Sequence, residues 1–190
     1  MTSPVSIASP GLAALHAAAA AAGLTVSAAA SWPETGADGE VPALAGFIES
    51  SFSPLLAEVA ARVLRRRAQP QGPGTVTAIV MVTALGDVTS AVRVAAAVDA
   101  GKRVSPLLFF QSVPNAVAGY LAVRWHLTGP VVCVSGTRAG MDVSALLIED
   151  ADADEVLVVR VDLAVAEDDR DCAAAVLLTG PVRGEPHRTA

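Results

Sequence analysis

The 190-residue chain is apolar and weakly charged, with 53% hydrophobic residues, 17% charged residues, 4% aromatic residues and a formal net charge of −6. This acidic balance argues against nucleic-acid binding, which needs a basic face to neutralise phosphates. The two cysteines, Cys133 and Cys172, lie in apolar runs, so we expect buried, inert thiols, no disulfide and a cytoplasmic protein. No apolar stretch reaches the length of a membrane span. Sparse charge favours a surface that another subunit partly covers.

The expected elements follow from two kinds of pattern. Alanine-rich or helically spaced apolar stretches predict helices, and unbroken β-branched runs predict buried strands. In chain order we expect, after a short apolar start at Val5–Ala8, a helix over Leu12–Ala22, a loop over Ser31–Pro42, a helix from an N-cap at Ser53 to Arg67, a strand over Thr75–Thr83, helices over Thr89–Ala100 and Asn115–Trp125, a strand over Val131–Ser135, a helix over Ala139–Ile148, a solvated acidic turn over Glu149–Glu155, and strands over Val156–Leu163 and Ala173–Leu178.

The alternation of strands and helices predicts an α/β sheet with helices on both faces. The last connection, Ala166–Asp171, is too short for a helical crossover, so the final strand is expected to be antiparallel. We expect one domain over residues 1–179 and a frayed tail over 180–190.

Several motifs downstream of Arg103 occur in a specific order. They are Arg103–Pro106 (RVSP), Phe109-Phe110, Pro114–Tyr120 (PNAVAGY) and His126–Pro130 (HLTGP), followed by the short strand that ends at Ser135. This text resembles the N-terminal half of the β-ketoacyl synthases. The resemblance covers about Val5–Thr179. It implies a thiolase-like half-domain with a five-stranded mixed sheet.

The resemblance also implies a missing nucleophile. The family carries its active cysteine on a tight turn between a strand and a buried helix, where the helix N-terminus favours a thiolate. The matching text here is Ser135-Gly136-Thr137-Arg138, which puts Arg138 at the nucleophile position. A guanidinium offers only hydrogen-bond donors and cannot attack a thioester. Arg138 then either lines a remnant acyl pocket, or contacts an anion there, or pairs with Asp142 one helical turn later.

Two further features point to a non-condensing role. The two histidines that the synthases' second half supplies have no counterpart here, since His16, His126 and His187 fall in none of the family's histidine motifs. The text Arg138–Asp142 (RAGMD) looks like the chain length factors, which are the non-condensing partners of aromatic and polyene ketosynthases.

The candidate site residues form two groups. Those expected at a pocket or subunit interface are Phe109, Phe110, Gln111, Ser112, Pro114, Asn115, Ser135, Thr137 and Asp142. Asn115 is also a candidate N-cap. Arg65, Arg66 and Arg67 either complement a helix dipole or form a landing patch for an acidic acyl carrier protein. No residue pattern predicts a metal site or a cofactor.

Three functions remain open from the sequence. The first is an inactive, chain-length-factor-like subunit that pairs with an active ketosynthase through the strand Val131–Ser135 in polyketide or fatty acid biosynthesis. The second is a homodimeric scaffold that binds acyl carrier protein. The third is a hydrolase, dehydratase or isomerase of carrier-bound chains, for which the candidate residues are Asp142, Ser135, Asn115 and Asp87.

Overall fold

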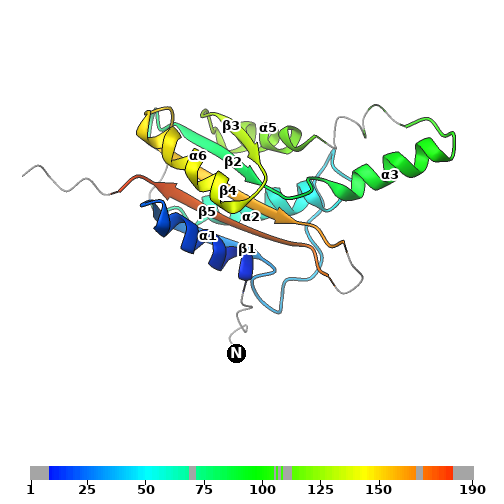
Figure 1. Cartoon of the computed structure of the whole chain (residues 1–190), viewed down its shortest axis with the longest axis horizontal. Coiled ribbons are helices and arrows are strands. Elements are labelled where there is room, and N and C mark those ends of the chain that lie inside the picture. Colours follow the sequence, from blue (N-terminus) through cyan, green and yellow to red (C-terminus); the bar gives the residue numbers. More distant parts are fainter. Residues whose placement is uncertain are drawn as a thin grey trace, which may run out of the picture.

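Five strands form one mixed sheet, which helices flank on both sides (Figure 1). The computed structural model describes residues 9–68, 72–104, 106, 108, 113–165 and 169–181. Its strands are β1 (Thr25–Trp32), β2 (Thr77–Val82), β3 (Val131–Val134), β4 (Glu155–Asp162) and β5 (Cys172–Thr179). Its helices are α1 (Pro10–Ala21), α2 (Phe52–Arg65), α3 (Val88–Asp99), α5 (Pro114–Trp125) and α6 (Thr137–Glu149).

The strand order is β1-β5-β4-β2-β3, which puts β3 at one edge of the sheet. Strand β2 pairs in parallel with both β3 and β4, whereas β5 pairs antiparallel with both β4 and β1. The predicted mixed sheet with an antiparallel last strand is therefore confirmed.

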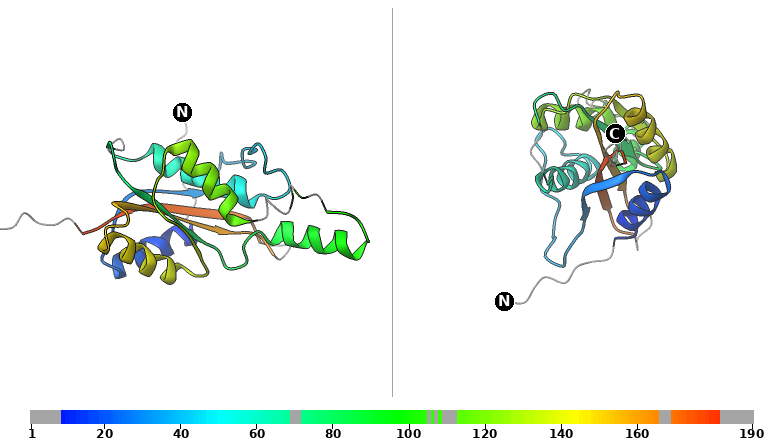
Figure 2. Two further views of the ribbon diagram at one scale, coloured as in Figure 1. Left: turned by 90° about the horizontal axis from the view of Figure 1, so that it is seen from above. Right: turned by 90° about the vertical axis from the view of Figure 1, so that its left-hand side faces the viewer.

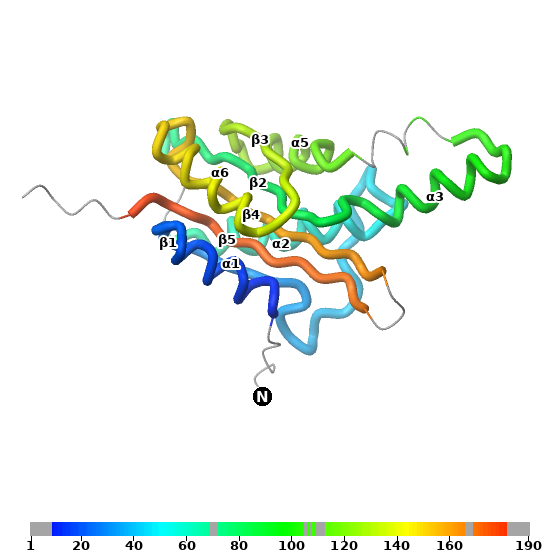
Figure 3. Tube along the Cα trace, in the orientation of Figure 1, coloured from blue at the N-terminus to red at the C-terminus, as the bar shows by residue number. Residues whose placement is uncertain are grey.

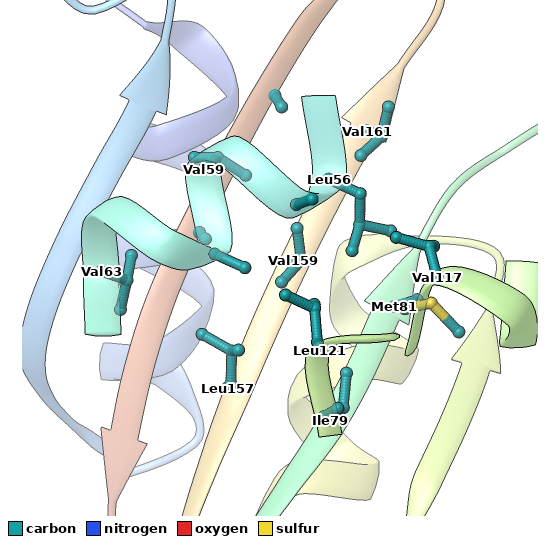
Figure 4. Close-up of a cluster of buried hydrophobic side chains, with 14 of the residues drawn as sticks. Leu56, Val59, Val63, Ile79, Met81, Val117, Leu121, Leu157, Val159 and Val161 are labelled. Atoms are coloured by element: carbon teal, nitrogen blue, oxygen red, sulfur yellow. The ribbon is translucent and has the colours of Figure 1, made fainter. Parts of the chain in front are cut away.

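The two faces of the sheet carry separate cores. Helices α2 and α5 cover one face, and α1 and α6 cover the other (Figure 2). Alternate residues of the central strands feed the two cores. Ile79 and Met81 pack under α2 and α5, beside Leu121 (Figure 4), and Val80 packs under α1 and α6. All six residues of β2 are buried, as its apolar, largely β-branched sequence predicts.

Strand β1 departs from the sequence-based expectation. Its sequence, TVSAAASW, is poor in β-branched residues, and part of it was assigned to a loop. It pairs with β5 from Thr25 to Trp32, and Ala28 and Ala30 are buried. Tertiary pairing overrides the weak local propensity here. The apolar start at Val5–Ala8 lies outside the described residues.

The helices α1, α2, α3, α5 and α6 all begin one or two residues before their expected first residues. Helix α2 begins at Phe52 after Ser51, and α6 begins at Thr137, two residues early. Asn115 is not an N-cap: α5 begins at Pro114, after Val113, and has no side-chain cap. Proline suits the first helical position because it needs no amide donor there.

Helix α3 stands apart from these layers. It projects beyond the end of the sheet, away from the other helices (Figures 1 and 3).

Candidate functional site

The candidate site is the turn from β3 into α6. Gly136 has φ 104°, a conformation that residues with a side chain rarely adopt, and α6 begins one residue later. Arg138 is the second residue of that helix. The turn therefore has the strand–turn–helix form that the sequence predicted, with the guanidinium at its outer end.

The Arg138 side chain is 95% exposed, and its Nε lies 3.9 Å from an Asp142 carboxylate oxygen. This contact matches the predicted pairing one helical turn apart, at the outer limit of an ion pair. Both side chains also border a groove of about 380 Å³ between α1 and α6. The rest of the lining is Ala18, Ala21, Ala22 and Met141. The arginine therefore borders an open, mostly apolar groove and does not plug an enclosed pocket.

The turn is tied to the sheet by the side chain that precedes Arg138. Thr137 accepts a hydrogen bond from the Arg160 guanidinium at 3.2 Å, and Arg160 also bonds Asp162 at 2.6 Å. Ser135 is exposed. No histidine is among the described residues that line the groove beside Arg138.

Gly140 allows α6 to approach β2 closely. A Cβ added at this position would lie 2.7 Å from a Val82 methyl. One turn later, the buried Ser144 hydroxyl donates to the Gly140 carbonyl at 2.7 Å. The glycine of the alanine-glycine pair after Arg138 therefore has a packing role, whereas Ala139 is exposed.

The HLTGP motif (His126–Pro130) also contains a glycine that lies close to β2. A Cβ on Gly129 would lie 2.7 Å from three backbone atoms of Thr77 and Ala78. The Gly129 amide donates to the Thr77 carbonyl at 3.0 Å, and the Ile79 amide donates to Pro130 at 2.9 Å. The motif therefore makes close backbone contacts with β2 that position β3 beside it. The sequence analysis did not predict this role.

The remaining pocket candidates are not gathered at the turn. Phe109, Phe110, Gln111 and Ser112 lie outside the described residues. Pro114 and Asn115 belong to α5, on the other face of the sheet, and neither lines the Arg138 groove. Asp87 caps α3, where it accepts from the Ser90 amide at 3.0 Å and the Ser90 hydroxyl at 2.7 Å. The residues suggested for another enzymatic reaction therefore do not form one cluster.

The three arginines at the end of α2 have different environments. Arg66 bonds Glu34 twice, at 2.6 Å each. The Arg67 side chain is 13% exposed and contacts Glu155 and Thr77, and burial lowers the pKa of Arg67. Arg65 is exposed and lines a groove of about 210 Å³ with Arg124. A landing patch would therefore depend chiefly on Arg65.

The expectation of a solvated acidic turn over Glu149–Glu155 is wrong for Glu155. It opens β4, is 8% exposed and accepts from the Thr77 hydroxyl at 2.5 Å while it contacts Arg67. No group of acidic, histidine and cysteine side chains in the described part of the chain could hold a metal ion.

Cys133 is exposed on β3 and Cys172 is half-buried on β5, so the expectation of a buried Cys133 is wrong. A strand side chain points to one face of the sheet, and on an edge strand the side chains of a neighbouring strand flank it on one side only. Desolvation still raises the pKa of both thiols, which keeps them protonated and poorly nucleophilic at neutral pH.

The sheet order and the strand–turn–helix element at Arg138 define a thiolase-like half-domain. Residues 31–169 match the model of the β-ketoacyl synthase N-terminal domain, and the chain belongs to this family. No curated protein matched the chain. Among the described residues, no helix is long and apolar enough to cross a membrane.

Solved structures show the same fold. The ketosynthase (ApeO) in complex with its chain length factor (ApeC) from Xenorhabdus doucetiae matches with TM-score 0.60 and 22% identity, over 75% of this chain and 63% of that chain. The ishigamide ketosynthase/chain length factor matches with TM-score 0.60 and 17% identity, over 75% of this chain and 47% of that chain. Ketosynthase twelve of the bacillaene polyketide synthase from Bacillus amyloliquefaciens matches with TM-score 0.52 and 12% identity, over 67% of this chain and 28% of that chain. The chain thus spans less than two thirds of each of these.

Proposed function

We propose that the protein is a ketosynthase-like subunit without condensing activity that pairs with an active ketosynthase in polyketide or fatty acid biosynthesis, in the manner of a chain length factor. The observation that carries this proposal is Arg138 at the turn between β3 and α6, where the family keeps its nucleophile. Its side chain is exposed, and its partner is Asp142.

The chemistry of the turn supports an inactive subunit. Condensation starts with a thiolate that attacks an acyl thioester, and an arginine at that position supplies neither a nucleophile nor a base. The nearest cysteine in the sequence, Cys133, lies within β3, and partial desolvation raises its thiol pKa. Neither His16, in α1, nor His126, at the end of α5, is among the residues that line the groove beside Arg138.

The edge of the sheet supports pairing. Among the described residues, strand β3 pairs with β2 alone, so its other side offers backbone groups that no described strand pairs with. Val131 on β3 is 40% exposed and Val123 on the adjacent α5 is 80% exposed. An open edge with apolar neighbours fits a subunit interface better than a free surface. The two complexes of a ketosynthase with a chain length factor that share the fold favour a ketosynthase as the partner.

The first test is pairing with a ketosynthase from the same organism, co-expressed with this protein. We expect the two to co-purify as a heterodimer. Val131→Lys places a charge at the edge and is expected to weaken the complex at least tenfold. Val165→Lys, at a valine 67% exposed in the loop after β4, is the matched control and should leave affinity unchanged. Equal binding by both variants would exclude the β3 edge.

Cys133 offers an independent readout of the same edge. In a Cys172→Ser chain, we expect iodoacetamide to label Cys133 in the free protein at pH 8.5, and at least tenfold more slowly in the complex. Unchanged labelling would place the partner elsewhere. A raised thiol pKa also predicts slower labelling at pH 7 than at pH 8.5.

The second test addresses inactivity. Incubation with an acylated carrier protein is expected to leave the purified chain without a covalent acyl group by intact-mass measurement, while the partner becomes acylated. An acyl adduct on this chain would refute the proposal.

Docking of the acidic carrier at Arg65 is a separate prediction, which Arg65→Glu tests through carrier binding.

A further inference from the structure

The groove of about 210 Å³ that Arg65 and Arg124 line lies between α2 and α5. These helices cover the face of the sheet opposite to α6, so the groove is separate from the Arg138 turn. Helix α5 contributes Tyr120, Arg124 and Trp125. Helix α2 contributes residues spaced so that they share one helical face, namely Pro54, Ala57, Glu58, Ala61 and Arg65. Two helices therefore bring aromatic and positively charged side chains together.

The two arginines of this groove lack a carboxylate partner. Six other arginines of the described chain each pair with an acidic side chain: Arg62, Arg66, Arg67, Arg93, Arg138 and Arg160. Arg65 and Arg124 form no ion pair with any described residue. Glu58, the one carboxylate among the described lining residues, is bonded by Arg62 at 2.9 Å. The groove therefore carries unpaired positive charge in a chain whose formal net charge is −6.

Helix dipoles account for the sign of these charges and not for their meeting. Arg65 is the last residue of α2, and Arg124 is the last but one of α5. A cation near a helix C-terminus is stabilised by the dipole on any side of the helix. Both arginines nevertheless border the same groove. Two guanidinium groups at one hollow can bind a carboxylate through charge-assisted hydrogen bonds.

The groove also gathers aromatic surface in a chain that has little of it. The chain contains one tyrosine and two tryptophans, and Tyr120 and Trp125 both line the groove. Tyr120 is 38% exposed, so a ligand can reach its ring. The Arg124 guanidinium lies 5.6 Å from the centroid of the Trp125 ring, within the range of a cation–π contact. A flat apolar group has rings to stack on beside the two charges.

The volume of the groove limits the size of its ligand. Water occupies about 30 Å³ per molecule in the liquid, so 210 Å³ corresponds to roughly seven waters. Drug-sized ligands occupy pockets of about 300–1,000 Å³, so this groove suits a smaller molecule. A carboxylate attached to a single ring has the right size, charge and shape.

We propose that the groove between α2 and α5 binds a small carboxylate that carries a planar apolar group. Arg65 and Arg124 face the carboxylate, and Tyr120 and Trp125 contact the planar group. A small monoanion meets both arginines without approaching the other acidic side chains. A large acidic protein would also meet the field of a chain that is itself acidic. This inference goes beyond the proposed function and does not rest on pairing with a ketosynthase.

The first test titrates benzoate into the purified full-length chain by isothermal titration calorimetry. We expect one site with a Kd of about 0.1–1 mM, as suits so small a ligand. Benzamide keeps the ring and lacks the charge, and acetate keeps the charge and lacks the ring. Each should bind at least tenfold more weakly than benzoate. If benzoate does not bind, or if acetate binds as tightly, the inference is wrong.

The second test places the site. In Arg65→Gln/Arg124→Gln, both positions are exposed, so the chain should fold as before, and benzoate should bind at least tenfold more weakly. Arg103→Gln/Arg170→Gln is the matched control. It removes the same charge at two exposed arginines outside the described lining of the groove, and it should change the Kd less than twofold. Equal loss of binding in both double variants would show a response to net charge and overturn the inference.

An acyl carrier protein is the competing occupant. If benzoate does not bind, and Arg65→Gln/Arg124→Gln abolishes carrier binding, the groove belongs to the carrier and the inference is wrong. Failure of the chain to bind a ketosynthase overturns the proposed function alone, because benzoate binding is measured on the isolated chain.

Discussion

Replacing Gly129 with alanine should destabilise the fold substantially, because the added methyl group meets backbone and not a mobile side chain. The Cβ would lie 2.7 Å from the amide nitrogen of Ala78 and from the carbonyl carbon and oxygen of Thr77. Comfortable carbon contacts are about 3.5–4.0 Å, so the two segments must separate by roughly 1 Å.

The cost of Gly129→Ala follows from what that separation disturbs. Overpacking of this kind costs about 1–3 kcal/mol. The movement also strains the hydrogen bonds from Gly129 to Thr77 and from Ile79 to Pro130, each worth about 1 kcal/mol. We therefore expect a loss of about 2–4 kcal/mol. With a urea dependence of about 2 kcal/mol per M, the midpoint should fall by about 1–2 M.

Gly119→Ala is the matched control. Gly119 lies in α5, and a Cβ there would meet nothing within 4 Å. Alanine should stabilise that helix by about 0.5–1 kcal/mol. Urea unfolding followed by circular dichroism compares the two variants with the wild type. If Gly129→Ala unfolds at the wild-type midpoint, the close approach between the HLTGP motif and β2 does not hold this part of the fold.

Two further predictions concern charged groups away from the interface. Hydrogen bonds from Arg62, at 2.7 and 3.0 Å, hold the pKa of Asp38 well below its ordinary 3.8. The ionised Asp38 therefore stabilises the fold fully above about pH 5, and this contribution is lost as the pH falls through the ordinary pKa towards the lower folded-state pKa. Between pH 7 and pH 3, the urea midpoint should fall less steeply in Asp38→Asn than in the wild type. Glu155→Ala leaves Arg67 buried without its carboxylate and should cost about 3 kcal/mol. Adding Arg67→Met should recover part of this loss in the same urea assay, and an unchanged loss would contradict the pairing.

The sequence predicted the central strands well, because their signals are local. The β-branched run that became β2 can be buried on both faces only in a central strand. The antiparallel β5 followed from the short connection before it. The turn at Gly136 was expected from the resemblance to the β-ketoacyl synthases and not from residue type and spacing.

The missed features depend on partners distant in the sequence. Strand β1 is alanine-rich and becomes a strand because β5 pairs with it. Glu155 looked like part of a solvated turn, and its burial depends on Arg67 and Thr77, more than seventy residues earlier. The exposure of Cys133 depends on β3 being an edge, which is a property of strand order.

The limits of the family match have a practical consequence for anyone who shortens this protein. The matched stretch, 31–169, omits all of β5, most of β1 and all of α1. Strand β5 lies between β4 and β1, so a fragment cut at those limits would lose the strand that covers one whole side of β4. The stretch by which the chain is recognised is thus smaller than the unit that must fold, and expression boundaries should include at least residues 9–181.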